Sequence, residues 1–135
     1  MKFYFDENIP KHIGHALRIL QEPMRTSEDV EVINIIDEFG PGTADEDWIP
    51  EIAKSDSVVI TQDLNIQLTR HQRMLYQDHG LGVVFLKPPS KRGFGYWMTV
   101  KKIIDAWEDI KIVSRKVKKP FAYVIRPRSK KLEPL

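Results

Sequence analysis

The sequence predicts a three-layer α/β/α domain with a mainly parallel central sheet. Short segments rich in β-branched and aromatic residues alternate along the chain with segments whose apolar residues recur at helical spacing. The length of 135 residues is that of one domain that can bury a hydrophobic core. Strict alternation of strand and helix implies parallel strands, right-handed crossovers and helices on both faces of the sheet.

Five segments are predicted to be strands because they are short and dominated by β-branched or aromatic residues. The third and fourth are almost wholly apolar, as strands buried on both faces are. Prolines flank the last of these segments, so we expect it to be an edge strand, either parallel or antiparallel to its neighbour. The predicted strands are residues 2–5, 30–36, 57–61, 83–86 and 121–125.

Four segments are predicted to be helices from the spacing of their apolar residues. Pro10 suits the first turn of the first helix, and Asn8 is its candidate cap. The third helix is mostly polar, and we expect Leu68, Met74 and Leu75 on its inner face. The predicted helices are residues 9–21, 44–53, 66–78 and 97–113.

The charge of the chain is divided unevenly along its length. Residues 1–110 hold 12 Lys and Arg against 18 Asp and Glu, a balance of −6, whereas residues 111–135 hold 9 against one, a balance of +8. We therefore divide the chain into an acidic body, residues 1–115, and a basic C-terminal strand and tail, residues 116–135, of the same domain. The basic part is either a solvated tail or a strip that follows a phosphate backbone.

Cysteine is absent, which excludes disulfides and thiolate metal sites. The chain contains no apolar run long enough for a membrane span, and no apolar signal-peptide core follows Met1. These observations favour a cytoplasmic protein without a membrane partner.

Acidic residues follow the predicted strands at equivalent points. Asp6 and Glu7 follow the first strand, Asp45 opens the helix after the second, and Asp63 follows the third. The carboxyl ends of parallel strands share one edge of the sheet, where ligands bind in such folds. Each acid alone is readily explained as a helix cap or turn residue, but together they predict a site for Mg²⁺ or a similar hard cation.

Basic residues near these acids are candidates for contact with a nucleic acid backbone. Arg70 and Arg73 follow Asp63 on the predicted third helix, where a solvated helix face is the alternative. The last strand is flanked by further basic residues, and for these too we predict contacts with a nucleic acid backbone: Lys118, Lys119 and Arg126.

Residues 5–10, 39–50 and 59–63 together resemble the PIN-like domains of VapC-type toxin nucleases and their uncharacterised relatives. The resemblance implies a PIN-like fold, a Mg²⁺- or Mn²⁺-dependent endoribonuclease that cleaves RNA, and an antitoxin protein as partner. By position, Asp6, Asp45 and Asp63 match the family's three acids, which hold the metal and are catalytic.

The sequence departs from the family pattern at one position. A fourth acid often follows the third by two residues, and here Asn65, a neutral oxygen ligand, stands there. Glu7 is then either a further metal ligand that replaces the missing charge or an acid favoured by the helix dipole.

Two other functions remain open. A receiver-like phosphoacceptor domain also has an acidic pair after its first strand and a lysine after its fourth, here Lys87. Alternatively, the change at Asn65 indicates a PIN-like module that binds RNA or an antitoxin with weakened catalysis. Residues 94–97 form an aromatic loop that serves packing, a homodimer or the antitoxin.

Overall fold

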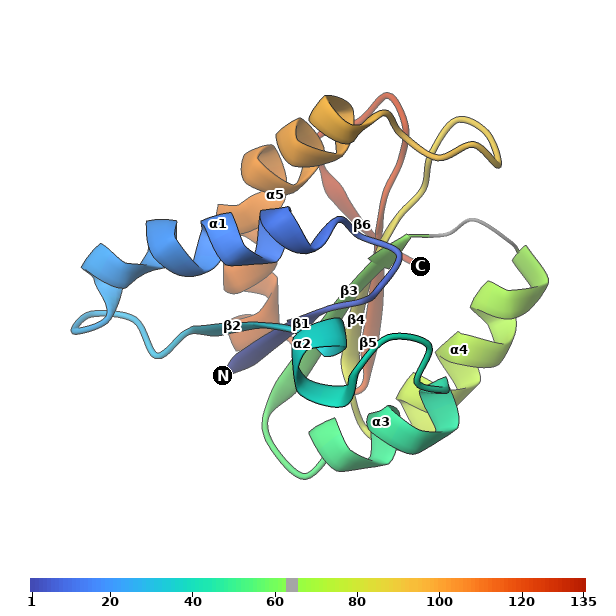
Figure 1. The fold of residues 1–135 in the computed structure, drawn as a ribbon, viewed down its shortest axis with the longest axis horizontal. Coiled ribbons are helices and arrows are strands. Elements are labelled where there is room, and N and C mark those ends of the chain that lie inside the picture. The colour runs from blue at the N-terminus through green and yellow to red at the C-terminus, as the bar shows by residue number, and fades with distance from the viewer. Residues whose placement is uncertain (63–65) are drawn as a thin grey trace.

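A computed structural model of the protein describes residues 1–62 and 66–135 and has one six-stranded sheet (Figure 1). The strand order is β2-β1-β3-β4-β5-β6, in which the first five are parallel and only β6 is antiparallel to its neighbour. The strands are β1 Lys2–Phe5, β2 Glu31–Asn34, β3 Ser57–Gln62, β4 Gly82–Leu86, β5 Phe121–Ile125 and β6 Leu132–Pro134.

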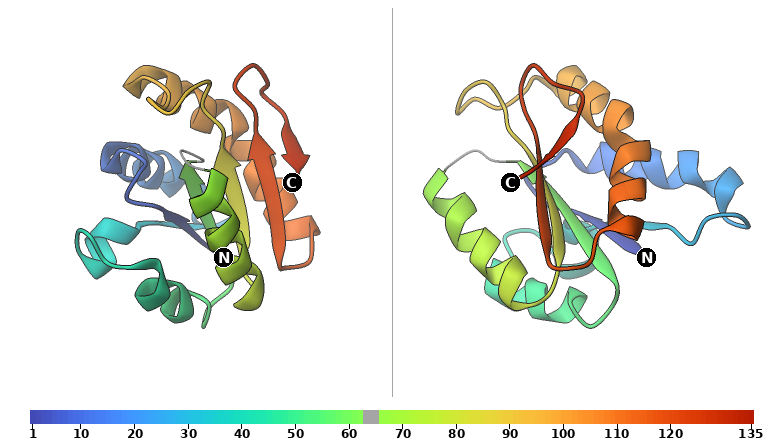
Figure 2. Two further views of the ribbon diagram at one scale, coloured as in Figure 1. Left: turned by 90° about the vertical axis from the view of Figure 1, so that its right-hand side faces the viewer. Right: turned by 180° about the vertical axis from the view of Figure 1, so that it is seen from behind.

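Helices cover both faces of this sheet (Figure 2). One face packs against α1 and α5, and the other packs against α2, α3 and α4. This arrangement confirms the predicted three-layer architecture. The helices are α1 Lys11–Gln21, α2 Ile35–Phe39, α3 Asp45–Ile52, α4 Ile66–Asp78 and α5 Tyr96–Lys116, with a short 3₁₀ helix, η1 Glu22–Met24. No helix in the described ranges is both long and apolar enough to cross a membrane.

The two cores follow from the alternation of side chains along the strands. In β1, Phe3 and Phe5 point to the α1/α5 side, where the Phe3 ring lies 5.1 Å from that of Trp107. Tyr4 points to the opposite side, into the core that contains Trp48 and Tyr76. Because β1 and β3 are buried on both faces, Asp6 directly after β1 and Thr61 within β3 are held on rigid elements.

The sheet has a topological switch point between β1 and β3. The chain crosses from β1 to β2 on one side and then returns to place β3 on the other side of β1. The two crossovers therefore leave in opposite directions, and in open α/β sheets the ligand crevice lies at such a point, outside the carboxyl ends of the strands. Asp6, the residue after β1, stands at this position.

The predicted second strand, residues 30–36, was too long. β2 ends at Asn34, and Ile35 and Ile36 begin α2. The Asn34 side chain donates to the carbonyl of Lys11 at 2.9 Å, which ties the end of β2 to α1. Ile35 is buried in the second core. A short apolar run that is wholly buried fits a strand and a helix equally well, so the sequence pattern did not show where β2 ends.

The prediction that residues 121–125 form an edge strand was wrong. β5 pairs with β4 in parallel, and the antiparallel β6 forms the edge instead. Pro120 and Pro127 lie outside the strand, so neither removes a hydrogen bond from its ladder.

Two further predictions about helices were wrong. Met74 is exposed and Tyr76 takes the buried position on α4. Asn8 does not cap α1, whose N-cap is Pro10. The Asn8 side chain instead bonds to the end of β3, 54 residues away along the chain, a partner that local pattern cannot indicate.

Candidate active site

Asp6 is held at the switch point with both carboxylate oxygens bonded. The Thr61 hydroxyl donates to Oδ2 at 2.6 Å, and the backbone N–H of Glu7 donates to Oδ1 at 2.7 Å. The backbone N–H of Asp6 itself donates to the carbonyl of Ile60 at 3.0 Å. Only 9% of Asp6 is exposed, so the two strands fix the position of a nearly buried acid.

The pKa of the Asp6 carboxyl is raised above its usual value. Burial is the largest cause, because it disfavours the ionised form. The hydrogen bonds from Thr61 and Glu7 act in the opposite direction, and the nearby charge of Asp45 adds to the increase. Asp45 thus lies close enough to Asp6 for the two carboxylates to repel each other.

Asp45 is the first residue of α3 and is oriented by α4. The side-chain amide of Gln72 donates to Asp45 Oδ2 at 2.9 Å. No side chain caps α3, whose N-cap is Ala44, so Asp45 does not serve as the cap that its position suggested. Gln72 lies in the middle of α4, so the start of α3 packs beside the middle of α4.

Tyr76 lies behind the two carboxylates. Its ring is buried between Trp48 and Phe85, with centroid distances of 6.3 and 6.4 Å. Burial raises the pKa of the Tyr76 phenol well above its usual value, and the charges of Asp6 and Asp45 raise it further. Its buried hydroxyl has no hydrogen-bond partner among residues 1–62 and 66–135. The Tyr76 hydroxyl is therefore a buried polar group that has no direct partner in this part of the chain and that the charges of Asp6 and Asp45 reach.

Asn8 fastens the loop after β1 to the end of β3. Its side-chain amide donates to the carbonyl of Gln62 at 3.2 Å, and its Oδ1 accepts the backbone N–H of Gln62 at 3.3 Å. The side-chain amide of Gln62 returns a bond to the carbonyl of Asn8 at 3.0 Å. These reciprocal bonds extend the pairing of β1 and β3 past the ends of the strands.

Glu7 points to the loop before α3. The backbone N–H of Gly42 lies 3.1 Å from each of its carboxylate oxygens. Gly42 has a φ of 71°, a conformation that glycine adopts without strain. Glu7 thus holds the loop that leads to Asp45, and its charge, like that of Asp45, adds to the rise in the pKa of Asp6.

The remaining predicted metal ligands, Asp63 and Asn65, lie outside the described residues. Within the described ranges, no three acidic, histidine or cysteine side chains gather as a group that could hold a metal ion. In the described part of the chain, the acids of the candidate site are Asp6 and Asp45.

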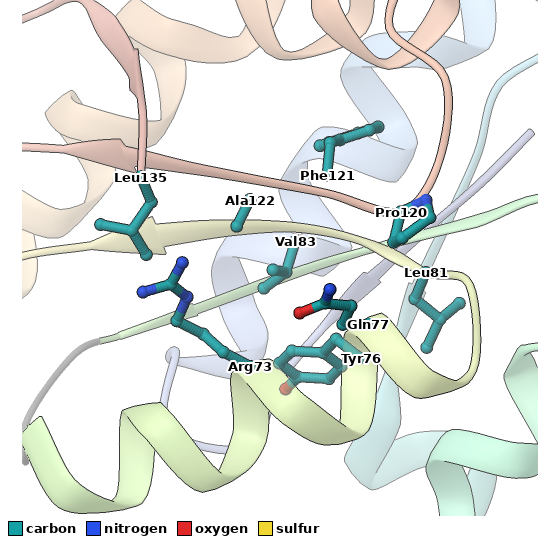
Figure 3. A pocket seen from close by; sticks show the side chains of 9 residues that line it. All are labelled: Arg73, Tyr76, Gln77, Leu81, Val83, Pro120, Phe121, Ala122 and Leu135. Atoms are coloured by element: carbon teal, nitrogen blue, oxygen red, sulfur yellow. The ribbon is translucent and has the colours of Figure 1, made fainter.

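The five basic residues predicted to bind RNA are dispersed. Arg70 is exposed on α4, and Arg73 lines a cavity of about 190 Å³ between α4 and strands β4 and β5 (Figure 3). Lys118 and Lys119 precede β5 and so lie at the amino edge of the sheet, opposite Asp6; Lys119 pairs with Asp56. Arg126 follows β5 at the carboxyl edge and pairs with Glu133 at 2.8 Å.

Sequence reasoning missed Thr61, Gln72 and Tyr76 as parts of this site. Thr61 carried a usable signal, because it is a polar residue near the carboxyl end of an apolar parallel strand. Gln72 and Tyr76 lie one turn apart on a mostly polar helix, and no motif marks them. Their roles depend on how α4 packs beside α3.

The Thr61 hydrogen bond predicts a measurable shift at Asp6. Thr61→Val keeps the shape of the side chain but removes the donor to Asp6 Oδ2, so the pKa of Asp6 should rise further. The loss of a buried bond to an ionised group should also lower the free energy of unfolding at neutral pH by about 1.5–3 kcal/mol. Thr61→Ser, which keeps the hydroxyl, is the matched control. An NMR titration of the Asp6 carboxyl carbon decides, and an unchanged midpoint in Thr61→Val would contradict this role.

Comparison with known proteins identifies the family. The model of the family described as "PIN like domain" matches residues 1–88, which include β1 to β4, Asp6 and Asp45. No curated protein and no solved structure matches the chain. The matched segment covers more than half of the chain and contains the switch point with both acids, and the chain therefore belongs to the PIN-like domain family.

Proposed function

We propose that this chain is a metal-dependent endoribonuclease that hydrolyses RNA phosphodiester bonds and acts as the toxin of a toxin–antitoxin pair. PIN-like domains are often nucleases, which gives the reaction class. The observation that carries the proposal is a nearly buried carboxylate, Asp6, fixed at the switch point beside a second carboxylate, Asp45. Two adjacent acids in a ligand-binding crevice have a clear use if a cation lies between them.

The two acids fit a divalent cation. Asp6 and Asp45 offer carboxylate oxygens, the donors that Mg²⁺ and Mn²⁺ prefer. A positive charge would offset the cost of burying ionised Asp6 as well as its repulsion by Asp45, and would thereby favour the ionised form. We propose Asp63 as a third ligand and Asn65 as a neutral one. A bound cation supplies the charge that activates water and stabilises the phosphodiester as it is cleaved.

The surrounding residues keep the acids in place for this task. The Thr61 hydroxyl and the Glu7 N–H each hold one oxygen of Asp6, so the carboxylate cannot rotate. Gln72 holds Oδ2 of Asp45 from α4, and Glu7 holds the loop before α3. Such fixed ligands lower the reorganisation needed when cation and substrate bind.

The receiver-like alternative is less well supported. A phosphoacceptor domain needs both acids after the first strand in one site, whereas Glu7 is bonded to Gly42. The strand order β2-β1-β3-β4-β5 does not separate the two functions, because signalling domains of this kind share it. The family match favours the nuclease.

A PIN-like module without catalysis would bind RNA and leave it intact.

The raised pKa of Asp6 leads to a prediction about stability without a cation. The pKa of Asp6 is higher in the folded state than in the unfolded chain, where it is about 4. Above about pH 4 the folded state therefore keeps a proton on Asp6 that the unfolded chain has lost. Ionised Asp6 therefore costs stability at neutral pH, and in EDTA Asp6→Asn should be more stable than wild type, with the difference vanishing as pH falls below about 4. Asn is tolerated because Thr61 can instead donate to Asn8 Oδ1, 3.2 Å away.

Thermal unfolding with and without MnCl₂ measures this effect. A cation at one hundred times its Kd should stabilise wild type by about 2.7 kcal/mol and Asp6→Asn much less. Asp47→Asn, an exposed acid on the same helix as Asp45, should respond as wild type does. Equal stabilisation of wild type and Asp6→Asn would place the cation elsewhere.

The second prediction concerns the reaction. RNA incubated with Mg²⁺ or Mn²⁺ should be cleaved by wild type and by Asp47→Asn, whereas Asp6→Asn and Asp45→Asn should lose at least about a hundredfold in rate, as expected for groups that act on transition-state charge. Gel analysis of end-labelled RNA gives the rates, and EDTA should abolish them. Full activity in Asp6→Asn would remove the nuclease assignment, and binding without cleavage by wild type would favour the module that lacks catalysis.

The third prediction concerns the toxin role, for which the support is the sequence resemblance. Induced expression of wild type or Asp47→Asn should arrest bacterial growth, and Asp6→Asn should not, at equal protein levels on an immunoblot. Co-expression of a small protein encoded beside this chain should restore growth and co-purify with it. Arrest by Asp6→Asn to the same degree would show that growth inhibition does not depend on this site.

A further inference from the structure

A second surface lies at the same edge of the sheet as Asp6. It consists of residues 87–98, which follow β4 and enter α5, and residues 126–131, which connect β5 to β6; we name it the aromatic–basic rim. All views place these two segments beside each other at one end of the molecule (Figures 1 and 2). It is separate from the acids that the proposed reaction uses.

Large apolar side chains are exposed on the rim. Trp97 is 72% exposed, and Tyr96 and Met98 beside it are 45% and 46% exposed. The rings of Trp97 and Tyr96 lie edge to face with their centroids 5.3 Å apart, and most of the Trp97 side chain remains exposed to solvent. The other two tryptophans, Trp48 and Trp107, are buried in the cores. An indole so exposed at the start of a helix contributes little to folding.

The rim is also strongly basic. Residues 87–98 contain three Lys or Arg and residues 126–131 contain four, and neither segment contains Asp or Glu. A groove of about 320 Å³ runs between the start of α5 and the β5–β6 connection and is lined by Met98, Lys101, Arg128 and Lys130 among others. Within the described ranges, Lys101 and Arg128 make no ion pair, while Lys130 lies 3.9 Å from Asp105.

A buried lysine joins the two segments of the rim. Lys102 is only 9% exposed, and its ammonium donates to the carbonyls of Arg126 at 3.2 Å and Ser129 at 2.7 Å. The same ammonium lies 5.7 Å from the centre of the Phe94 ring. One side chain thus fixes the β5–β6 connection and the loop before α5 relative to each other, so the exposed groups have a defined arrangement.

The rim is within reach of the proposed reaction centre. β1 and β5 are three strand spacings apart in the sheet, which is about 14 Å. Both the rim and Asp6 follow carboxyl ends of parallel strands, so a strand of nucleic acid can pass along one edge from the cations of the rim to the acids of the switch point. Lys118 and Lys119, at the amino edge, are not on this path.

We propose that the aromatic–basic rim binds unpaired RNA, with a base stacked on Trp97 and phosphates in contact with Lys101 and Arg128. Exposed aromatic rings beside unpaired cations are the two elements of single-strand binding surfaces. Stacking on an indole requires a base that is free of its own helix, and so a single strand fits this surface and a duplex does not. The choice of RNA rests on the proposed function, whereas the surface itself does not depend on catalysis.

The test is binding of a fluorescently labelled oligouridylate, measured by anisotropy in EDTA so that no metal-dependent cleavage destroys the probe. Trp97→Ala should weaken binding about tenfold or more, and Trp97→Phe, which keeps a ring, should retain most of it. Arg128→Ala should also reduce the slope of log K against log salt by about 0.7. The tryptophan fluorescence of wild type should be quenched by the RNA, and that quenching should be lost in Trp97→Phe.

Two matched controls accompany these variants. Ile19→Ala removes a side chain that is also 72% exposed but lies on α1, and Lys118→Ala removes an exposed cation from the amino edge; both should bind as wild type does. Wild-type affinity in Trp97→Ala, equal affinity for the oligouridylate and its duplex with oligoadenylate, or a loss in Lys118→Ala equal to that in Arg128→Ala would overturn the proposal. Loss of cleavage in Asp6→Asn with binding intact separates this test from that of the nuclease.

Discussion

The hydrogen bonds that hold Asp6 between β1 and β3 are the constraint on which the site depends. A carboxylate that is nearly buried is costly unless its oxygens are bonded, and here Thr61 and the Glu7 N–H bond both. Thr61 lies 55 residues from Asp6, so these bonds require β3 to return to the side of β1 and end level with it. The register that pairs Phe5 with Ile60 meets this requirement.

The bonds beyond the strand ends make the crevice rigid on both sides. Asn8 and Gln62 exchange bonds on the β3 side. On the other side, Glu7 holds Gly42 and thereby the loop that leads into α3 and Asp45. The repulsion between Asp6 and Asp45 is thus maintained by the surrounding structure. The raised pKa of Asp6, whose largest cause is burial, is a perturbation of the kind that clusters at functional sites.

The fold also redistributes the charge of the chain. Residues 111–135 are rich in Lys and Arg, but β5 enters the sheet beside β4 and divides these basic residues between the two edges. Lys118 and Lys119 remain at the amino edge, whereas Arg126 to Lys131 reach the carboxyl edge, where Lys102 anchors their backbone. An acidic crevice and a basic surface consequently lie along one edge of the same sheet, although they come from distant parts of the sequence.

The sequence alone determined the alternation of strands and helices, the parallel sheet and the place of Asp6 at the carboxyl end of β1, because these follow from local periodicity. Only the tertiary structure decided that Ile35 is helical, that β5 is an inner strand and that Glu7 holds a loop. It also decided that Tyr76, not Met74, faces the core. Each of these outcomes depends on a partner far away in the chain, such as Gly42 for Glu7 or β4 for β5, and local pattern contains no information about such partners.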